Sequence, residues 1–473
     1  MFLGVPFAKP PVKELRFEKP VPPDNWTLKE TLEYQSSCLP LIIPERSAKF
    51  LYWTEKYDED CLYLNIFSPH KSENDLNIDT PNLPVLVLIH GGIFLFGSSF
   101  GYSNYVDIGQ KYVNQGIIVV TLQHRLGVFG FASSGDSNLP GNLGLWDLTA
   151  ALNAGSALIG ALSLSPNSAD YFSQAAQFSA TILSARGTGA HVVESTLELA
   201  NSVNCQNSNT LKMKECLKAL STENLLSAIK QQALLTTPEK QFGIPTFGPL
   251  VEHDFFQEVD YPDLMRIYAK NSKPTMIGYN NLEALYICEG SAGKSNCRIL
   301  YWRQVCRRKC YFLFGTIRSV SVRLAVHSAI LWEARIKAVN NWPLYLYVIT
   351  YASSDLPEEV PVKGSFHTKD DDYLFKTHSQ TKEFSKSDQK VEDQLVNSLR
   401  NFVKYGDPSF GSVKWPLTDA KIFRRMRFDL PSATVEDSTE DFKRVEFWDK
   451  LIKLTGYNAV RDIFVNKSNK NEL

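Results

Sequence analysis

Two glycines that follow an apolar run are the first residues whose type and placement suggest chemistry. Gly91 and Gly92 come directly after the run Pro84–Ile89 and His90. Glycine lacks a Cβ, so the backbone N–H groups at such a strand end can approach a substrate closely. Fixed N–H donors stabilise the oxyanion that forms during acyl transfer. The pattern indicates an oxyanion-binding loop, although a plain strand-to-loop turn would have the same letters.

Acyl transfer also needs a nucleophile, and two serines are candidates by their letters. The stretch Gly97–Gly101 fits Gly-x-Ser-x-Gly, with Ser99 at its centre. A nucleophilic serine of this kind sits on a sharp turn with a strand directly before it and a helix directly after it. Ser99 instead follows the glycine loop, and Ser156 has no glycine two positions before it. Neither serine is therefore expected to act as the nucleophile.

The elements that must position such a site alternate along the chain. Continuous β-branched and apolar runs predict buried strands, and an alternating run at 62–67 predicts an outer strand. Helical periodicity appears at 262–270 and 392–405. This order predicts an α/β fold with a mostly parallel sheet covered by helices on both faces. We expect one domain over 1–473, with further strands at 84–89, 117–122, 175–179, 274–278 and 344–349.

The composition excludes several classes of protein. Lys plus Arg is 50 and Asp plus Glu is 51, so the net charge gives no reason to expect a nucleic acid as partner. The chain has no run of about 18 apolar residues, so no membrane span is predicted. The N-terminus has no basic start followed by an apolar core, so it is not read as a signal peptide. The chain is therefore expected to begin inside a mature domain.

Other features favour the secretory route. Two sequons occur, at Asn25 and Asn466, and residues 470–473 (Lys-Asn-Glu-Leu) resemble a KDEL-type retrieval signal, unless they are only a polar tail. Four of the eight cysteines have spacings that suit disulfides closing short loops. The expected pairs are Cys38 with Cys61 and Cys205 with Cys216.

The remaining cysteines lie in an Arg- and Lys-rich stretch at 287–325. A structural zinc site would use paired short spacings such as Cys-x2-Cys, which this stretch lacks. We therefore expect no metal there and read 287–325 as irregular. The cysteines are Cys288, Cys297, Cys306 and Cys310.

Several motifs together resemble the type-B carboxylesterase/cholinesterase family of α/β-hydrolases. The string Glu59–Asn65 (EDCLYLN) is long and specific, and the resemblance continues to the C-terminal part of the chain. Only 287–325 does not follow it. The other matching segments are Gly4–Pro11 with Leu15–Phe17, His90–Ser98, Arg125–Phe131, Gly141–Asp147 and Asn401–Pro408.

The resemblance implies an α/β-hydrolase fold and the hydrolysis of small carboxylic esters through an acyl-enzyme, without a cofactor. Glu283 matches the family's acid and His367 its histidine, which would act as base and then as acid. Gly91, Gly92 and Ala154 match the oxyanion donors. Thr368 replaces the glycine that usually follows the histidine. The family also suggests an ion pair between Arg16 and Glu59.

The serine itself does not match. The helix expected over Leu145–Leu152 is followed at once by Asn153–Gly160, which resembles the segment at and after the serine turn, so Asn153 stands at the serine position. The absent helix end, strand and turn amount to roughly twenty residues. A carboxamide cannot act as an alkoxide-like nucleophile. The chain is therefore expected to be inactive as a serine esterase.

Loss of that strand also has a structural consequence. In this fold it lies in the middle of the sheet, so its loss would leave neighbouring strand edges unpaired and a gap in the core. We expect residues 143–164 to form one helix, kinked at Gly155, with no strand between. An alternative function on the same scaffold is non-catalytic adhesion or ligand binding, as in neuroligin-like relatives. The sequence does not give the oligomeric state.

Overall fold

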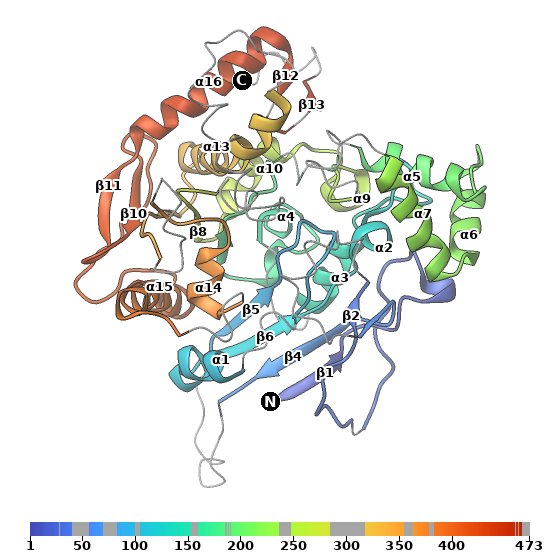
Figure 1. Ribbon diagram of the computed structural model, residues 1–473, viewed down its shortest axis with the longest axis horizontal. Coiled ribbons are helices and arrows are strands. Elements are labelled where there is room, and N and C mark those ends of the chain that lie inside the picture. Colours follow the sequence, from blue (N-terminus) through green and yellow to red (C-terminus); the bar gives the residue numbers. More distant parts are fainter. Residues whose placement is uncertain are drawn as a thin grey trace.

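The apolar runs form the strands of two sheets in a computed structural model of the chain. The structure describes residues 1–27, 29–39, 56–69, 83–99, 105–152, 159–184, 187, 189, 191–235, 247–283, 317–353, 363–377, 383–458, 460–461 and 463–465. Figure 1 shows the first sheet in the lower part of the molecule and the second sheet toward the left, with the C-terminal helix at the top.

The first sheet has the order β1-β4-β6-β5. Its strands are β1 (Phe2–Pro6), β4 (Tyr63–Phe67), β6 (Ile118–Leu122) and β5 (Val85–Ile89). β5 and β6 are parallel, whereas β4 runs antiparallel to both of its neighbours. The prediction that residues 62–67 form an outer strand was wrong, because β1 pairs along the outside of β4.

The second sheet has the order β11-β10-β9-β8-β7. Its strands are β11 (Thr434–Asp437), β10 (Arg424–Phe428), β9 (Leu344–Ile349), β8 (Thr275–Asn280) and β7 (Ala175–Phe178). β7 to β10 are mutually parallel, and β11 adds an antiparallel edge. Every residue of β8 and β9 is buried, as expected for parallel strands covered on both faces. The carboxyl ends of β7, β8 and β9 therefore lie side by side.

The two sheets are separate among the described residues, and β5 is an end strand of the first sheet and β7 an end strand of the second. Two apolar clusters include side chains from both sheets: Val87 with Ala175 in one, and Leu88 with Met276 in the other. The halves of the molecule are thus joined in part through side-chain packing. The loss of a strand from the middle of the sheet stays a prediction, because residues 153–158 lie outside the described residues.

The junction where the serine turn was expected lies between two helices. α3 spans Leu143–Leu152 and α4 spans Ile159–Leu162, and α4 packs against β7. Residues 163–164 form a turn, so the expected helix does not extend to residue 164. Residues 153–158, with the proposed kink at Gly155, lie outside the described residues.

Other helices cover the two sheets. α14 contacts β8, α15 contacts β10, and α13 contacts β8 and β9. Besides α3 and α4, the described helices are α1 (Tyr105–Lys111), α2 (Gly127–Phe131), α5 (Val192–Ser202), α6 (Thr210–Ala219), α7 (Thr222–Leu235), α9 (His253–Phe256), α10 (Tyr261–Ile267), α13 (Ile317–Val339), α14 (Lys369–Phe375), α15 (Lys386–Tyr405) and α16 (Thr439–Thr455).

Smaller elements complete the described chain. The 3-10 helices are Lys13–Leu15, Val113–Gln115, Ala169–Tyr171 and Tyr268–Asn271. Two short strand pairs are β2 (Ser37–Cys38) with β3 (Tyr57–Asp58), and β12 (Tyr457–Asn458) with β13 (Ile463–Phe464). Within the described ranges, no helix is long and apolar enough to cross a membrane.

Part of the stretch read as irregular is helical. α13 begins at Ile317, so residues 317–325 belong to a helix of 23 residues. The four cysteines of this stretch lie outside the described residues.

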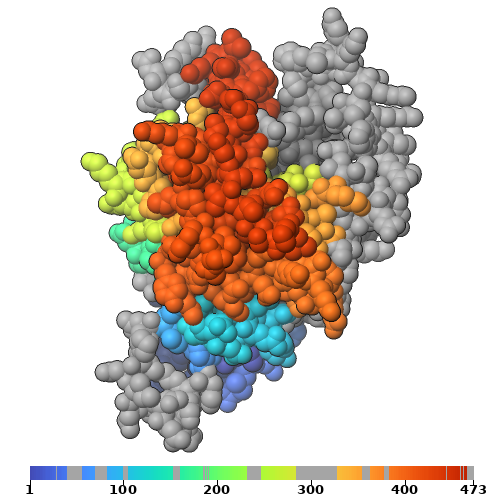
Figure 2. Space-filling view, turned by 90° about the vertical axis from the view of Figure 1, so that its left-hand side faces the viewer, coloured from blue at the N-terminus to red at the C-terminus, as the bar shows by residue number. Residues whose placement is uncertain are grey.

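Figure 2 shows one face of the molecule, where C-terminal residues (orange to red) lie above the blue and cyan residues of the N-terminal half.

The expected covalent and ionic links are present. Disulfides join Cys38 to Cys61 and Cys205 to Cys216, with Cα–Cα distances of 5.0 and 5.5 Å. The buried Arg16 guanidinium donates to the Glu59 carboxylate through Nε at 2.7 Å and Nη2 at 2.5 Å. Arg16 Nη1 also donates to the Lys218 carbonyl at 3.0 Å. The predicted disulfides and ion pair are therefore confirmed.

Candidate active site

The structure brings Glu283 and His367 together although 84 residues separate them. A single parallel bridge pairs Leu282 with Phe366, and the Leu282 N–H donates to the Ser365 carbonyl at 2.8 Å. Glu283 directly follows Leu282, and His367 directly follows Phe366, so the bridge places the acid beside the histidine. His367 Nδ1 lies 2.5 Å from Glu283 Oε2, and the imidazole is 34% exposed. With Nδ1–H donating to the carboxylate, the neutral ring has Nε2 as its acceptor.

Two groups hold the other oxygen of Glu283. The Asn280 N–H at the end of β8 donates to Oε1 at 2.6 Å, and Ser179 Oγ lies 2.7 Å from the same atom. Ser179 directly follows β7 and has a φ of +51°. The carboxylate is thus fixed between two parallel strands, which orients its second oxygen toward His367. An acid–histidine pair held this way can accept and return a proton.

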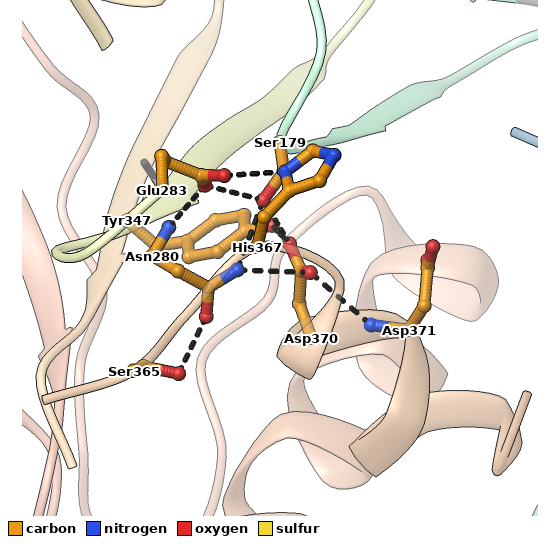
Figure 3. A network of polar contacts seen from close by, with 8 residues as sticks. All are labelled: Ser179, Asn280, Glu283, Tyr347, Ser365, His367, Asp370 and Asp371. Atoms are coloured by element: carbon orange, nitrogen blue, oxygen red, sulfur yellow. Dashed lines mark hydrogen bonds and ion pairs between the residues drawn. The ribbon is translucent and has the colours of Figure 1, made fainter. Parts of the chain in front are cut away.

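A further carboxyl group lies behind this pair (Figure 3). Asp370 Oδ2 is 2.9 Å from Ser179 Oγ and 2.9 Å from the Tyr347 hydroxyl. Asn280 Nδ2 donates to Ser179 Oγ and to Asp370 Oδ1, both at 3.0 Å. Burial raises the pKa of Asp370, and the negative charge of Glu283 raises it further. Burial, reinforced by Asp370, likewise raises the pKa of Tyr347.

Thr368 follows the histidine in a conformation that favours glycine. Its φ is +71°, in the left-handed region, and it precedes the first turn of α14. A β-branched residue rarely adopts this conformation, which costs on the order of 1–2 kcal/mol. The replacement of the family's glycine noted above is therefore strained in this chain.

The glycine loop after β5 has the expected backbone character at one of its two glycines. Gly92 has a φ of +128°, and a Cβ there would lie 1.9 Å from the Phe96 carbonyl oxygen. At Gly91, by contrast, a Cβ would meet nothing within 4 Å. The Leu95 N–H donates to the Gly92 carbonyl at 3.0 Å, which closes the loop. Gly92 is thus required by the backbone, whereas Gly91 leaves open space.

Two buried histidines stack next to this loop. The sequence did not suggest this pair. The rings of His90 and His124 stack at 4.7 Å between centroids with an angle of 8°. His90 Nδ1 is 3.0 Å from the Gly91 carbonyl. Burial and the neighbouring His124 lower the pKa of His90 to about 3, and burial lowers the pKa of His124 to about 4. Both rings are therefore neutral at pH 7.

The serine candidates have different outcomes. Ser99 is buried, and its Oγ accepts from Asn65 Nδ2 at 3.3 Å while its N–H donates to Gln123 Oε1 at 3.2 Å. β5 ends at Ile89, so no strand directly precedes Ser99. Asn153, Ala154 and Ser156 lie outside the described residues. Over the part of the chain that is described, no group of three or more His, Cys, Asp or Glu residues could hold a metal ion.

The acid follows the parallel strand β8 and meets a histidine from a later loop, and the family match gives the class of fold, an α/β-hydrolase. The model of the carboxylesterase family matches residues 1–154, 153–309 and 317–448, so the chain belongs to the carboxylesterase family. Two of the matched segments meet and overlap at residues 153–154, where the serine segment was expected. The match also includes most of 287–325, so the expectation that this whole stretch departs from the family was wrong.

Two of three similar proteins match nearly the whole chain, and the third matches part of it. Gut esterase 1 of Caenorhabditis elegans is 27% identical over 552 aligned positions, which cover 100% of this chain and 94% of that protein. The medium-chain fatty acyl-CoA hydrolase precursor of Anas platyrhynchos is 26% identical over 520 positions, covering 95% and 88%. Carboxylesterase 5A of Mus musculus is 33% identical over 316 positions, covering 61% and 51%.

The first of these alignments is longer than the chain itself. Its 552 positions include all 473 residues of the chain. The nematode protein therefore has residues at internal positions where this chain has none.

Proposed function

We propose that this chain retains the acid–histidine pair of a carboxylic ester hydrolase but lacks its serine nucleophile, so that it does not hydrolyse esters through an acyl-serine. The contact between Glu283 and His367 carries the first part of this proposal. The second part rests on the junction after Leu152, where Asn153 takes the serine position by resemblance and two separately matched family segments meet.

The chemistry of the retained groups fits this division. In a complete relative the histidine takes the proton of the serine hydroxyl, and the glutamate stabilises the resulting imidazolium. The oxyanion would bind N–H groups of Gly91, Gly92 and the residue after the nucleophile, here Ala154. The substrates of such a complete relative would be small carboxylic esters or thioesters, as the names of the similar proteins suggest. Retention of the acid and histidine favours descent from an ester hydrolase that has lost its serine over a role in adhesion or ligand binding.

A burst assay tests the absence of the nucleophile. The purified full chain is mixed with p-nitrophenyl acetate, and in parallel with a fluorophosphonate probe followed by intact-mass measurement. We expect no burst of nitrophenol and no covalent adduct. A burst and an adduct that both disappear in His367→Ala, but persist in the exposed-site control His191→Ala, would overturn the proposal.

Restoring the segment provides the complementary test. An insertion of about twenty residues between Leu152 and Asn153 that ends in a strand and Gly-x, combined with Asn153→Ser, rebuilds Gly-x-Ser-x-Gly with Ala154 and Gly155. We expect the introduced serine to react with the probe and the reaction to require His367. If the folded insertion variant stays unreactive, the retained groups are not arranged for catalysis. The transcript across codons 152 and 153 shows whether such a segment exists.

We also propose that the protein resides in the lumen of the endoplasmic reticulum or is secreted. Two disulfides fit an oxidising compartment. Asn25 is exposed within its sequon, whereas Asn466 and residues 470–473 lie outside the described residues. Expression behind a signal peptide tests the proposal: we expect a glycosidase-sensitive protein that is retained, and that is secreted when residues 470–473 are removed. Retention without those residues would contradict the role of this tail.

A further inference from the structure

Two buried carboxyl groups lie on either side of one hydroxyl in the network behind His367 (Figure 3). Ser179 Oγ is 2.7 Å from Glu283 Oε1 and 2.9 Å from Asp370 Oδ2. Relative exposure is 4% for Ser179, 8% for Glu283 and 1% for Asp370. Both distances are those of O–H···O hydrogen bonds.

The protons available for these two contacts can be counted. A serine hydroxyl has one proton, so Ser179 can donate to only one of the two carboxyl groups. The Asn280 amide donates to Ser179 Oγ and cannot bridge either O···O contact. Two ionised carboxylates would therefore leave one contact between oxygens without a proton, in a buried site where such repulsion is costly. One carboxyl group must be protonated to satisfy both contacts.

The surroundings indicate which carboxyl group has the proton. Glu283 Oε2 accepts a hydrogen bond from His367 Nδ1, and an ionised carboxylate is a stronger acceptor for such an N–H than a neutral acid. Asp370 is the more deeply buried of the two acids and has no cationic side chain among its hydrogen-bond partners. We propose that Asp370 is a neutral carboxylic acid that donates to Ser179, so that Ser179 donates to Glu283.

This assignment gives every group a consistent role. Tyr347 donates to Asp370 Oδ2, Asp370 donates to Ser179, and Ser179 donates to Glu283, whose second oxygen binds the His367 N–H. Asp370 is thus a positioning residue: it fixes the direction of the Ser179 hydroxyl and leaves a single negative charge beside the imidazole. The ionisable side chains that face it are Glu283, Tyr347 and His367, and its pKa is raised by burial and by Glu283.

Isotope-edited infrared spectroscopy tests the assignment on the unaltered full chain. A protonated carboxylic acid has a C=O stretch that a carboxylate lacks, and carbon-13 shifts its frequency. At pH 7 we expect such a band to shift in protein labelled only at aspartate and to stay in place in protein labelled only at glutamate. A band that shifts only with glutamate labelling, or no band at all, would overturn the proposal.

Titration of His367 provides a readout that a merely structural role would not change. Asn is an isostere of the protonated acid, so Asp370→Asn should leave the midpoint of the His367 imidazole titration, followed by NMR, unchanged. If Asp370 is ionised, this variant removes a nearby negative charge and lowers the midpoint by about one pH unit or more. Glu283→Gln is the positive control and should lower it. Neither experiment depends on ester hydrolysis, so a burst in the earlier assay would leave this inference standing.

Discussion

The stacked histidines below the glycine loop predict that acid destabilises the fold. His90 and His124 are buried, and their pKa values are lowered to about 3 and about 4. In the unfolded chain a histidine has a pKa of about 6.5. Between these values the unfolded chain binds more protons than the folded protein. The stability that the neutral pair contributes is therefore fully present above about pH 6.5 and is lost as the pH falls toward 4 and 3.

The magnitude follows from the size of each difference. For His124, a pKa that falls from about 6.5 to about 4 corresponds to about 3 kcal/mol, and for His90 the fall to about 3 corresponds to about 5 kcal/mol. The value for His90 includes repulsion by a protonated His124, so the two are not independent. The pair therefore amounts to less than the simple sum of about 8 kcal/mol, which is still a large part of the roughly 5–15 kcal/mol that stabilises an ordinary domain.

Urea unfolding at pH 7, 6, 5 and 4 measures this effect. His124→Phe keeps a ring in the stack but cannot bind a proton, so its stability should fall less steeply with acid, by about 1.4 kcal/mol per pH unit near pH 5. The exposed-site variant His191→Gln is the control and should follow the parent chain. If His124→Phe loses stability as steeply as the parent, the buried neutral pair is not responsible for the acid sensitivity.

Two further changes have clear expected outcomes. Arg16→Ala leaves the buried Glu59 carboxylate without its partner and should lower the free energy of unfolding by about 3–5 kcal/mol. The exposed pair of Lys9 and Asp24 is the control: Lys9→Ala should change the free energy of unfolding by no more than about 1 kcal/mol. Thr368→Gly relieves a positive φ, so it should raise the free energy of unfolding by about 1 kcal/mol and with it the melting midpoint. A lower midpoint for this variant would show that the threonine side chain makes a compensating contact.

Most of the strands could be predicted from their letters. The continuous run Leu344–Ile349 forms β9 with the expected bounds, because a buried parallel strand is apolar on both faces. β1 was missed because its five residues include glycine and end in proline, a composition that reads as a loop. Its pairing with β4 depends on a contact across about sixty residues, which local pattern cannot show.

The site was predictable only where the family motif named its residues. Glu283 and His367 were identified by resemblance, and the structure places them in contact. Ser179 and Asp370 were not foreseen, because their contact depends on how β7, β8 and α14 meet in space. One signal was available: Asp370 is an acidic residue only three positions after His367, in the first turn of the helix that follows it.

The separation of the two sheets has a consequence for how the molecule unfolds. Within a sheet, neighbouring strands share a ladder of backbone hydrogen bonds, but among the described strands no such ladder connects β5 with β7. Apolar side chains hold the two halves together, with some polar contacts such as Lys111 to Glu392 and to the Tyr373 carbonyl. All of these contacts lack the fixed register of paired strands. Each half therefore has the means to open as its own cooperative unit, and hydrogen exchange should resolve two opening free energies where an unbroken sheet would give one.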